Sequence, residues 1–398
     1  MPAQRQDDGE KPKAVGLFAG IGGIEVGLAE AGFETTLLCE VDPAAQLVLR
    51  DRLPGIPLHD DVTKLAELPA ANLLAAGFPC QDLSQAGRTA GIGGAQSSLV
   101  EHVFRLLDGA ASPPKWLLLE NVPFMLTLDR GEAMTYLTRE LSSRGWEWAY
   151  RVVDTRAYGL PHRRLRVILI ASREADPRPV LFEEEETPVE QEFSAGAWCG
   201  FYWTEGLRGL GWAVEAVPTL KGGSAVGIPS APGIWNSATN EIGTPDIRDA
   251  ERLQGLAADW TLPAIEDPKR RNNPRWRLVG NAVSTPVARW VGERLLSSPE
   301  DGSFPWEEVS KALEGSWPKA AWGNASGTFA VPDLGTWPRS EPYTPLSEFL
   351  QHDLHPLSHR AASGFLGRTY KGNLKTFADG FREAVAAHVK AMDALQVV

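Results

Sequence analysis

Near its start the chain reads Lys13-Ala-Val-Gly-Leu-Phe18, and Ala19-Gly20-Ile21-Gly22-Gly23 follows at once. The apolar run predicts a buried strand, the glycines predict a tight turn, and Ile24 to Leu28 opens a helix. In this geometry, nucleotide cofactors approach backbone N–H groups at a helix N-terminus. Glycine-rich turns are common, so by itself the stretch is a weak signal for a ligand.

Acidic residues follow the next two predicted strands. Residues 35–39 form an apolar strand that ends in Glu40, the place where an acidic side chain grips a ribose diol. A solvated helix cap is the alternative for Glu40. Asp61 and Val62 come at the following strand end, where Asp61 either faces a purine edge or caps a helix.

A cysteine stands at the tip of a further strand. Residues 72–76 are apolar, and Gly77-Phe78-Pro79-Cys80-Gln81 follows. Pro79 ends the strand because it lacks an N–H and fixes its own φ. Cys80 therefore begins a polar, glycine-rich segment that runs to Ser98, a position where α/β proteins place chemistry. The alternative is a small buried hydrophobic residue.

Charged residues border two more strands. Glu120 directly follows the apolar run at 116–119, and a carboxylate there is costly to bury unless it has a partner or a task. Arg164 and Arg166 stand two apart before a final strand at 167–170, a spacing that places both side chains on one face. Together they can clamp a phosphate or an oxyanion, or they form a solvated basic edge.

Composition limits the class of protein. The chain has 398 residues, 43% of them hydrophobic, and a net charge of -12, which argues against a protein that coats polyanions. Three cysteines at no metal-ligand spacing argue against a zinc site or a disulfide scaffold. We expect a cytoplasmic protein, because no signal peptide and no membrane span is recognisable.

One segment is strongly basic in this acidic chain. Five cations occur in nine residues, and an aromatic residue lies among them: Lys269, Arg270, Arg271, Arg275, Trp276 and Arg277. Phosphate contact is one interpretation of this run, and a solvated face is the other. From about residue 298 the chain changes to a region rich in Trp, Gly and Pro, which ends in an amphipathic helix.

Taken together, the chain resembles the C5-cytosine DNA methyltransferase family. The matching motifs come in the family's order over about residues 14–297: Phe18-Ala-Gly-Ile-Gly-Gly23, Glu40, Asp61, Pro79-Cys80-Gln81, Glu120-Asn121-Val122, Arg164-Leu165-Arg166, Arg252-Leu253-Gln254-Gly255 and Gly280-Asn281-Ala282-Val283. One such motif is weak, but the ordered set is strong. It implies a doubly wound, mostly parallel α/β sheet with the site at the strands' carboxyl ends.

The resemblance also implies catalytic roles. Cys80 would add as a thiolate to C6 of cytosine, and Glu120 would bind N3 and the 4-amino group. Arg166, supported by Arg164, would bind O2. The methyl donor would be S-adenosylmethionine, held by Phe18, Ala19, Gly20, Ile21, Gly22, Gly23, Glu40, Asp61, Val62, Pro79, Asn281 and Val283.

The implied partner is double-stranded DNA, from which the target base is flipped out. Residues expected to contact DNA are Gln81, Ser84 and Arg88 in the catalytic loop, with Lys269, Arg270, Arg271 and Arg275. The implied setting is a bacterial restriction-modification or antiviral defence system, with other defence proteins as partners. A transfer-RNA methyltransferase and a catalytically silent relative are the alternatives.

The expected organisation has three parts. Residues 13–172 form the cofactor-binding catalytic domain, completed by 278–297, and residues 173–277 form the target-recognition region. Residues 298–398 form a separate extension for DNA or partner contact, whose deletion should weaken DNA binding and leave cofactor binding intact. The chain departs from the family at His162, where Gln is usual, and near Gly94-Ala95-Gln96, where an Asp-x-Arg element is missing.

Overall fold

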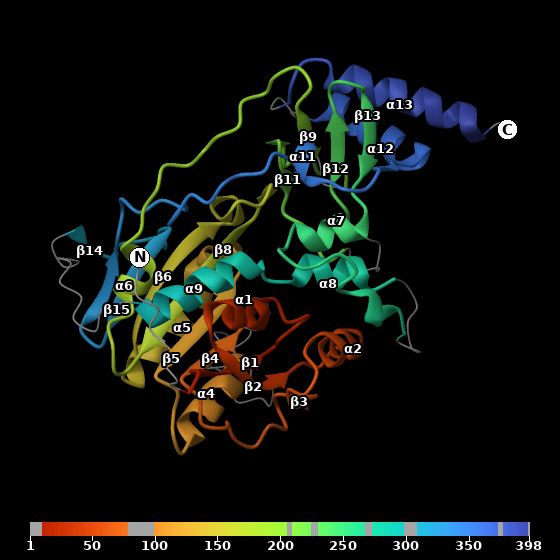
Figure 1. Cartoon of the computed structure of the whole chain (residues 1–398). Coiled ribbons are helices and arrows are strands. Elements are labelled where there is room, and N and C mark those ends of the chain that lie inside the picture. The colour runs from red at the N-terminus through yellow and green to blue at the C-terminus, as the bar shows by residue number, and fades with distance from the viewer. Residues whose placement is uncertain are drawn as a thin grey trace, which may run out of the picture.

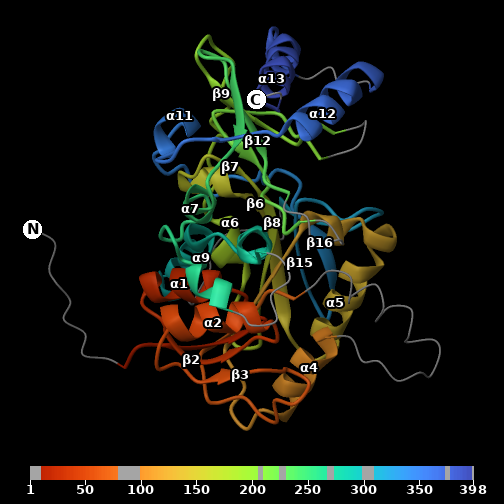
Figure 2. The ribbon, with the colours of Figure 1, turned by 90° about the vertical axis from the view of Figure 1, so that its right-hand side faces the viewer.

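The computed structural model shows two lobes (Figures 1 and 2). It describes residues 10–78, 99–204, 209–223, 230–266, 273–297, 309–372 and 377–396. Within these ranges no helix is long and apolar enough to cross a bilayer.

A ten-stranded sheet forms the larger lobe, in the order β14-β16-β15-β6-β8-β5-β4-β1-β2-β3. The strands from β5 to β3 pair in parallel, and the remaining pairs are antiparallel. The bounds are β1 (Lys13–Leu17), β2 (Glu34–Cys39), β3 (Leu58–His59), β4 (Leu73–Ala76), β5 (Trp116–Asn121), β6 (Glu147–Asp154), β8 (Leu165–Ser172), β14 (Lys311–Ala312), β15 (Ala320–Asn324) and β16 (Gly327–Ala330).

Helices cover both faces of this sheet, as a doubly wound fold requires. Those on one face are α4 (Leu99–Gly109) and α5 (Glu132–Ser143), and those on the other are α1 (Gly23–Ala31), α6 (Arg178–Phe182) and α9 (Thr285–Ser297). The side chains of β1 and β4 alternate between these two cores, because successive residues of a strand point to opposite faces. The predicted α/β fold is confirmed, including the late helix at 285–296.

The smaller lobe contains a five-stranded antiparallel sheet in the order β10-β9-β12-β13-β17. Two C-terminal helices, α12 (His359–Lys371) and α13 (Phe381–Gln396), pack on it through an aromatic cluster. The strands are β9 (Trp198–Phe201), β10 (Ala213–Val214), β12 (Gly233–Asn236), β13 (Glu241–Thr244) and β17 (His355–Pro356).

Short elements connect the two lobes. β7 (His162–Arg163) pairs in parallel with β11 (Val217–Pro218), so the chain before β8 is bonded to the smaller lobe. The remaining short elements are α2 (Pro43–Arg52), η1 (Pro123–Leu126) and η2 (Leu128–Gly131) of the larger lobe, together with η3 (Thr155–Tyr158), α7 (Ile247–Arg252), η4 (Leu262–Glu266), α8 (Arg275–Asn281) and α11 (Leu346–Phe349).

The C-terminal hundred residues do not form a separate region, which corrects that expectation. β15 pairs with β6 and so extends the larger sheet, whereas β17, α12 and α13 complete the smaller lobe. Phe381 and Val385 of the predicted amphipathic helix are buried in the smaller lobe's core. The C-terminal residues are shared between the lobes for two reasons. β15 pairs with the edge of β6, which would otherwise expose unpaired backbone groups, and α12 and α13 bury the apolar face of the small sheet.

Candidate active site

A cavity of about 1180 Å³ lies at the carboxyl ends of the parallel strands, between the two lobes. The larger lobe contributes Phe18, Gly20, Glu40, Asp61, Val62, Phe78, Glu120 and Arg166, and the smaller lobe contributes Tyr202, Thr219, Leu220, Lys221 and Gly222. The α8 segment adds Arg277, Leu278, Gly280 and Asn281. Residues far apart in the sequence therefore meet in one space.

The glycine turn between β1 and α1 forms one wall. Phe18 and Gly20 both have φ of 56°, and both line the cavity. A Cβ built on Gly20 would meet no protein atom within 4 Å, so the space above this residue belongs to the cavity. Ala19 is bonded through its N–H to the Cys39 carbonyl at 3.1 Å, and Ile21 is buried. Ala19, Ile21, Gly22 and Gly23 are absent from the cavity wall and build the turn.

Glu40 organises this turn. Its carboxylate accepts the Gly20 N–H and the Asp42 N–H, each at 2.7 Å. Burial is the main cause of the raised pKa of Glu40, and these backbone hydrogen bonds oppose it. The side chain thus holds the turn and faces the cavity at the same time.

Asp61 closes a turn, where a helix cap was one expectation, and it also faces the cavity. Its Oδ1 atom accepts the Thr63 N–H at 2.9 Å and the Thr63 hydroxyl at 2.7 Å, as a capping residue does. These bonds lower the pKa of Asp61 to about 2. Asp61 and Val62 also line the cavity.

Glu120 and Arg166 form an ion pair in the cavity wall. Arg166 Nε lies 2.8 Å from Glu120 Oε1, and both side chains are nearly buried. The two residues come from the neighbouring strands β5 and β8, whose antiparallel register places Glu120 opposite Ile168. Desolvation lowers the pKa of Arg166, and the Glu120 carboxylate opposes that shift. A carboxylate and a cation are therefore presented together to whatever enters the cavity.

Arg164 does not share the cavity wall with Arg166, which corrects the expectation of two side chains pointing the same way. It precedes β8, so the alternation of a regular strand does not apply. Its buried guanidinium donates to the carbonyls of Leu220 at 3.1 Å, Gly280 at 3.2 Å and Ala282 at 2.6 Å. Arg164 therefore ties the smaller lobe and α8 to the larger sheet.

His162 performs a similar task beside it. The ring is fully buried, with Nδ1 3.0 Å from the Leu253 carbonyl and Nε2 3.0 Å from the Leu220 N–H. Because Nε2 accepts from an N–H, the proton lies on Nδ1 and the ring is neutral. Burial lowers the pKa of His162 well below its ordinary value, and Arg164 adds to the effect. His162, where the family usually has Gln, thus provides one hydrogen-bond donor, Nδ1, and one acceptor, Nε2, as a Gln side chain also can.

The cysteine expected to react, Cys80, lies outside the described residues, as do Pro79, Gln81, Ser84 and Arg88. The last described residue before this gap is Phe78, and its carbonyl accepts a hydrogen bond from Asn121 Nδ2 at 3.0 Å. Cys39 and Cys199 are buried, and burial raises the pKa of each thiol to about 12. Neither of these two cysteines is therefore set up as a thiolate.

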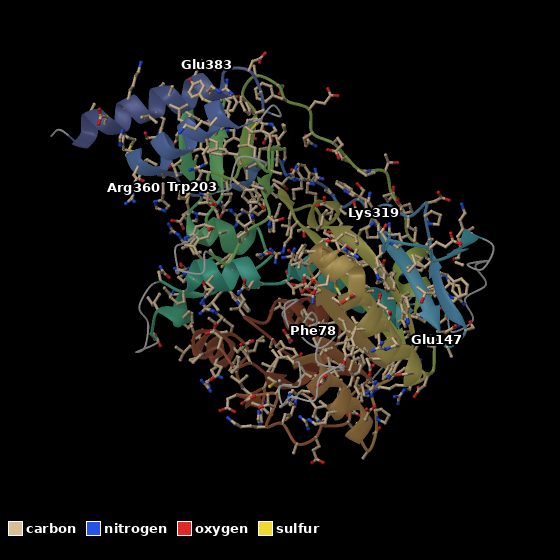
Figure 3. All side chains as sticks on the ribbon, turned by 180° about the vertical axis from the view of Figure 1, so that it is seen from behind. Phe78, Glu147, Trp203, Lys319, Arg360 and Glu383 are labelled. Carbon is tan, nitrogen blue, oxygen red and sulfur yellow. The ribbon has the colours of Figure 1, made fainter. Side chains whose placement is uncertain are left out.

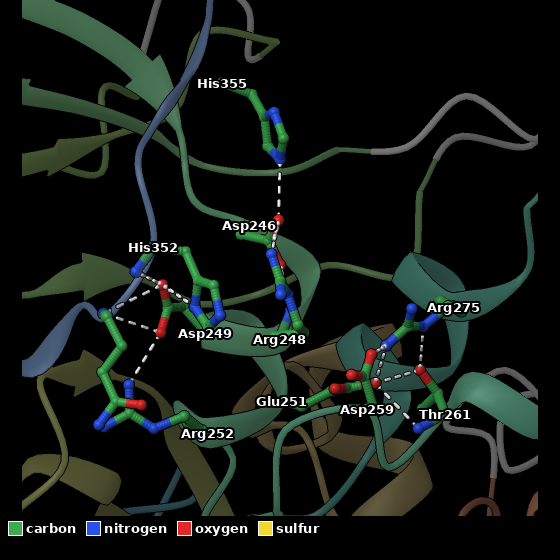
Figure 4. A network of polar contacts seen from close by, with 11 residues as sticks. Asp246, Arg248, Asp249, Glu251, Arg252, Asp259, Thr261, Arg275, His352 and His355 are labelled. Carbon is green, nitrogen blue, oxygen red and sulfur yellow. Dashed lines mark hydrogen bonds and ion pairs between the residues drawn. The ribbon is translucent and has the colours of Figure 1, made fainter.

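Arg275 is not placed for DNA contact, which corrects another expectation. Its buried guanidinium lies 3.0 Å from Glu251 and 2.9 Å from Asp259, and it donates to Thr261 (Figure 4). The cation is therefore already neutralised inside the protein. Lys269, Arg270 and Arg271 lie outside the described residues.

A neighbouring set of polar contacts on α7 holds the C-terminal part of the chain. Asp249 is fully buried and accepts the backbone N–H groups of Gln351 and His352, while its Oδ2 lies 3.1 Å from His352 Nδ1 (Figure 4). His355 Nε2 lies 3.0 Å from Asp246 Oδ2. These bonds fix the segment that leads into β17 and α12 against α7.

Asn281 lines the cavity, as expected for a cofactor-binding residue, but Val283 is not among the residues that line it. A Cβ built on Gly23 would meet the Val283 carbonyl at 2.3 Å, so the Val283 backbone packs directly on the start of α1. This close approach explains the glycine at position 23 and gives Val283 a packing role instead.

Several residues of the cavity are not among those expected from the sequence. Lys221 Nζ lies 3.9 Å from the Tyr202 ring centroid, and Arg277 forms an ion pair with Asp42, which also lines the cavity. Lys319 reaches the cavity from the end of the chain that was expected to be separate, and Figure 3 shows it in the same lobe as Phe78. The basic run contained Arg277, but no local signal indicates Lys319.

The comparisons with known proteins agree with this geometry. Residues 13–202 match the family described as C-5 cytosine-specific DNA methylase. The chain is 48% identical over 379 residues to the Type II methyltransferase M2.BsuMI of Bacillus subtilis, a match that covers 93% of this chain and 96% of that relative. It is 34% identical over 169 residues to M.BsuFI of Bacillus subtilis, covering 42% of this chain and 41% of that one.

A solved structure shares the fold. The Dnmt2 methyltransferase of S. pombe superposes with a TM-score of 0.51 at 16% identity, covering 72% of this chain and 98% of that one. From the extensive match to a Type II methyltransferase, together with the ordered motifs, the chain belongs to the C-5 cytosine-specific DNA methylase family.

Proposed function

We infer that this protein transfers a methyl group to C5 of cytosine in a specific double-stranded DNA sequence. The observation that supports this most is the Glu120–Arg166 pair, which faces the same cavity as the Gly20 turn. The carboxylate can accept from the 4-amino group and from a protonated N3 of cytosine, and the guanidinium can donate to O2. The cavity is large enough to hold a base and a nucleoside cofactor together.

The chemistry requires a nucleophile because C5 of cytosine is unreactive. We propose that the Cys80 thiolate forms a bond to C6, while Glu120 accepts a hydrogen bond from a protonated N3 and Arg166 donates to O2, so that negative charge on the ring is offset. C5 would then form a bond to the methyl group as that group's bond to the donor sulfur breaks and the thioether leaves. The C5 proton would pass to solvent, and breaking of the bond between Cys80 and C6 would restore the aromatic ring and the thiolate.

The residues present fit S-adenosylmethionine. Gly20 leaves open cavity where a side chain would stand, Glu40 offers carboxylate oxygens beside it, and Asp61 and Val62 lie further along the same wall. S-adenosylmethionine, when bound there, supplies the methyl group. Phe18 would hold its body, Glu40 its ribose and Asp61 its adenine, and Asn281 would close the pocket.

The duplex would lie against the smaller lobe. A base inside DNA cannot reach the Glu120–Arg166 pair, so it must be flipped out. We propose residues 173–277 as part of the target-recognition region, with Gln81, Ser84, Arg88 and Lys269 to Arg271 as DNA contacts. We also propose that the protein acts in the bacterial cytoplasm, as part of a restriction-modification or antiviral defence system, together with other defence proteins.

The test is transfer of labelled methyl from S-adenosylmethionine to DNA and, in parallel, to transfer RNA. We expect label on DNA cytosine C5, lost in Cys80→Ala and retained in the matched control Cys199→Ala. Base-resolution mapping would then reveal the target sequence. Label on transfer RNA alone, or no label on either nucleic acid despite cofactor binding, would overturn the proposal.

A further inference from the structure

The two C-terminal helices are integral to the smaller lobe. The Phe201 ring on β9 stacks on Phe365 of α12 with centroids 5.1 Å apart, and it meets Phe381 of α13 at 4.9 Å. Trp212 also contacts Phe381 at 4.9 Å. All three phenylalanine side chains are buried. Because this core fixes both helices, the outer face of α12 has a defined position.

Helix α12 is hydrogen-bonded to the chain segment that leads to the cavity. Arg368 donates a hydrogen bond from Nη2 to the carbonyl of Trp203. The residue before Trp203 is Tyr202, whose side chain lines the cavity and contacts Lys221 there. Figure 3 shows that Trp203 and Arg360 both belong to the smaller lobe. One bond therefore joins α12 to the strand end that forms the cavity wall.

The charge of α12 is unusual for this protein. The helix contains Arg360, Arg368 and Lys371 and no acidic residue, although the whole chain carries a net charge of -12. Arg360 and Lys371 are exposed, and within the described ranges neither forms an ion pair. By contrast, Arg248 and Arg252 of α7 are paired with aspartates. The exposed cations of α12 thus lack the internal acidic partners that neutralise others.

The spacing of these cations suits a duplex. Arg360 and Lys371 are eleven residues apart, which places them on one helix face about 16 Å apart along the axis. That distance is about half of the 34 Å helical repeat of B-DNA. The small residues Ser363, Gly364 and Gly367 occupy the same face between them. A Cβ built on Gly367 would meet nothing within 4 Å, so a phosphate backbone could approach closely.

We propose that α12 is a DNA-backbone clamp of the recognition lobe, in which Arg360 and Lys371 contact phosphates of the duplex whose target cytosine enters the cavity. This inference rests on the proposed function and extends it to a segment beyond the last catalytic motif. Contacts to phosphate position the protein on DNA and carry no direct sequence information. The clamp therefore contributes affinity and register to the complex.

The test compares the full-length protein with Arg360→Gln/Lys371→Gln in DNA binding over a series of salt concentrations. Each lost phosphate contact reduces the slope of log K against log salt by about 0.9, so the double variant should lose about 1.8. Affinity should fall equally for target and non-target duplexes, while S-adenosylmethionine binding stays unchanged. Ser363→Glu, which keeps both cations, should also weaken DNA binding.

The matched control is Lys390→Gln on α13. Lys390 is exposed and lies seven residues after Glu383, which Figure 3 shows at the top of the smaller lobe, so it shares that distant face. It should leave the slope unchanged. A wild-type slope in the double variant, with DNA methylation intact, would overturn the clamp alone. A wild-type protein that neither binds nor methylates DNA would overturn the proposed function as well.

Discussion

The two lobes differ in how the chain builds them. The parallel half of the larger sheet comes from consecutive strands between β1 and β5, with helices between them. The smaller lobe takes β9 to β13 from the middle of the chain and β17, α12 and α13 from its end. Local motifs therefore specify the catalytic wall, whereas long-range packing specifies the lobe that faces it.

The largest effect to expect comes from truncation. Removing residues 358–398 should expose the apolar face of the small sheet, because Phe365 and Phe381 are buried there. DNA binding should be lost, while S-adenosylmethionine binding by the larger lobe survives. Removing residues 298–398 should also abolish cofactor binding, since β15 would no longer cover the edge of β6.

Thermal unfolding and cofactor titration of both truncations distinguish the two lobes. The structure thereby revises the expectation, drawn from the sequence alone, that deletion after about residue 300 weakens only DNA binding. Intact cofactor binding in the longer truncation would contradict a structural role of β14–β16 in the larger lobe.

The two neighbouring arginines provide the next comparison. Arg166→Gln should reduce turnover by about 10²–10³, the usual effect of removing one charge-stabilising donor. Arg164→Gln should instead lower the free energy of unfolding by about 3 kcal/mol, because three buried carbonyls lose a charged donor. Single-turnover kinetics and chemical denaturation of both variants separate these effects. Equal losses of turnover at matched stability would show that Arg164 also touches the substrate.

Glu25, a buried residue of α1, should make the stability of the larger lobe depend on pH. It is buried, one of its oxygens has no hydrogen-bond partner within the described structure, and burial raises its pKa to about 7 from 4.5. The folded state holds a proton that the unfolded state releases, so this stabilisation is present below pH 4.5 and is lost as pH rises through 7. The loss amounts to roughly 3 kcal/mol.

Denaturation of Glu25→Gln between pH 5 and pH 8 checks this, because the variant cannot titrate. We expect a flatter dependence of unfolding free energy on pH than in the wild type. A pH dependence identical to that of the wild type would contradict the assignment of this proton to Glu25.

His162 should give the opposite trend at the junction of the lobes. Its pKa is lowered from 6.5, so the folded state keeps the ring neutral while the unfolded state takes up a proton as pH falls. Stability is therefore present above pH 6.5 and falls below it, by at most about 1.4 kcal/mol for each pH unit. His162→Gln should reduce that acid-side slope. A slope that stays the same would contradict the buried neutral ring.

Because local motifs build the larger lobe and long-range contacts build the smaller one, the larger lobe is the part that the sequence predicts best. The strand, glycine turn and helix at 13–31, the strand that ends at Glu120 and the late helix α9 follow from local pattern, and the structure contains each of them. The burial of Arg275 could not be foreseen, because its partners Glu251 and Asp259 depend on how η4 and α8 pack.

Long-range contacts account for the other differences. Lys319 reaches the cavity only because β15 pairs with β6, and α12 belongs to the smaller lobe because Phe365 packs on Phe201 of β9. Arg164 and Arg166 separate because β8 begins between them. Neither composition nor spacing carries this information.

The most direct measurement is covalent trapping on a duplex with 5-fluorocytosine at the mapped target site. Fluorine at C5 cannot leave as a proton does, so the proposed route ends at a stable bond between Cys80 and C6 after methyl transfer. We predict a denaturation-resistant protein–DNA adduct that requires S-adenosylmethionine, disappears in Cys80→Ala and forms much more slowly in Glu120→Gln. An adduct of equal yield in Cys80→Ala, or none with a protein that methylates the normal duplex, would contradict this account.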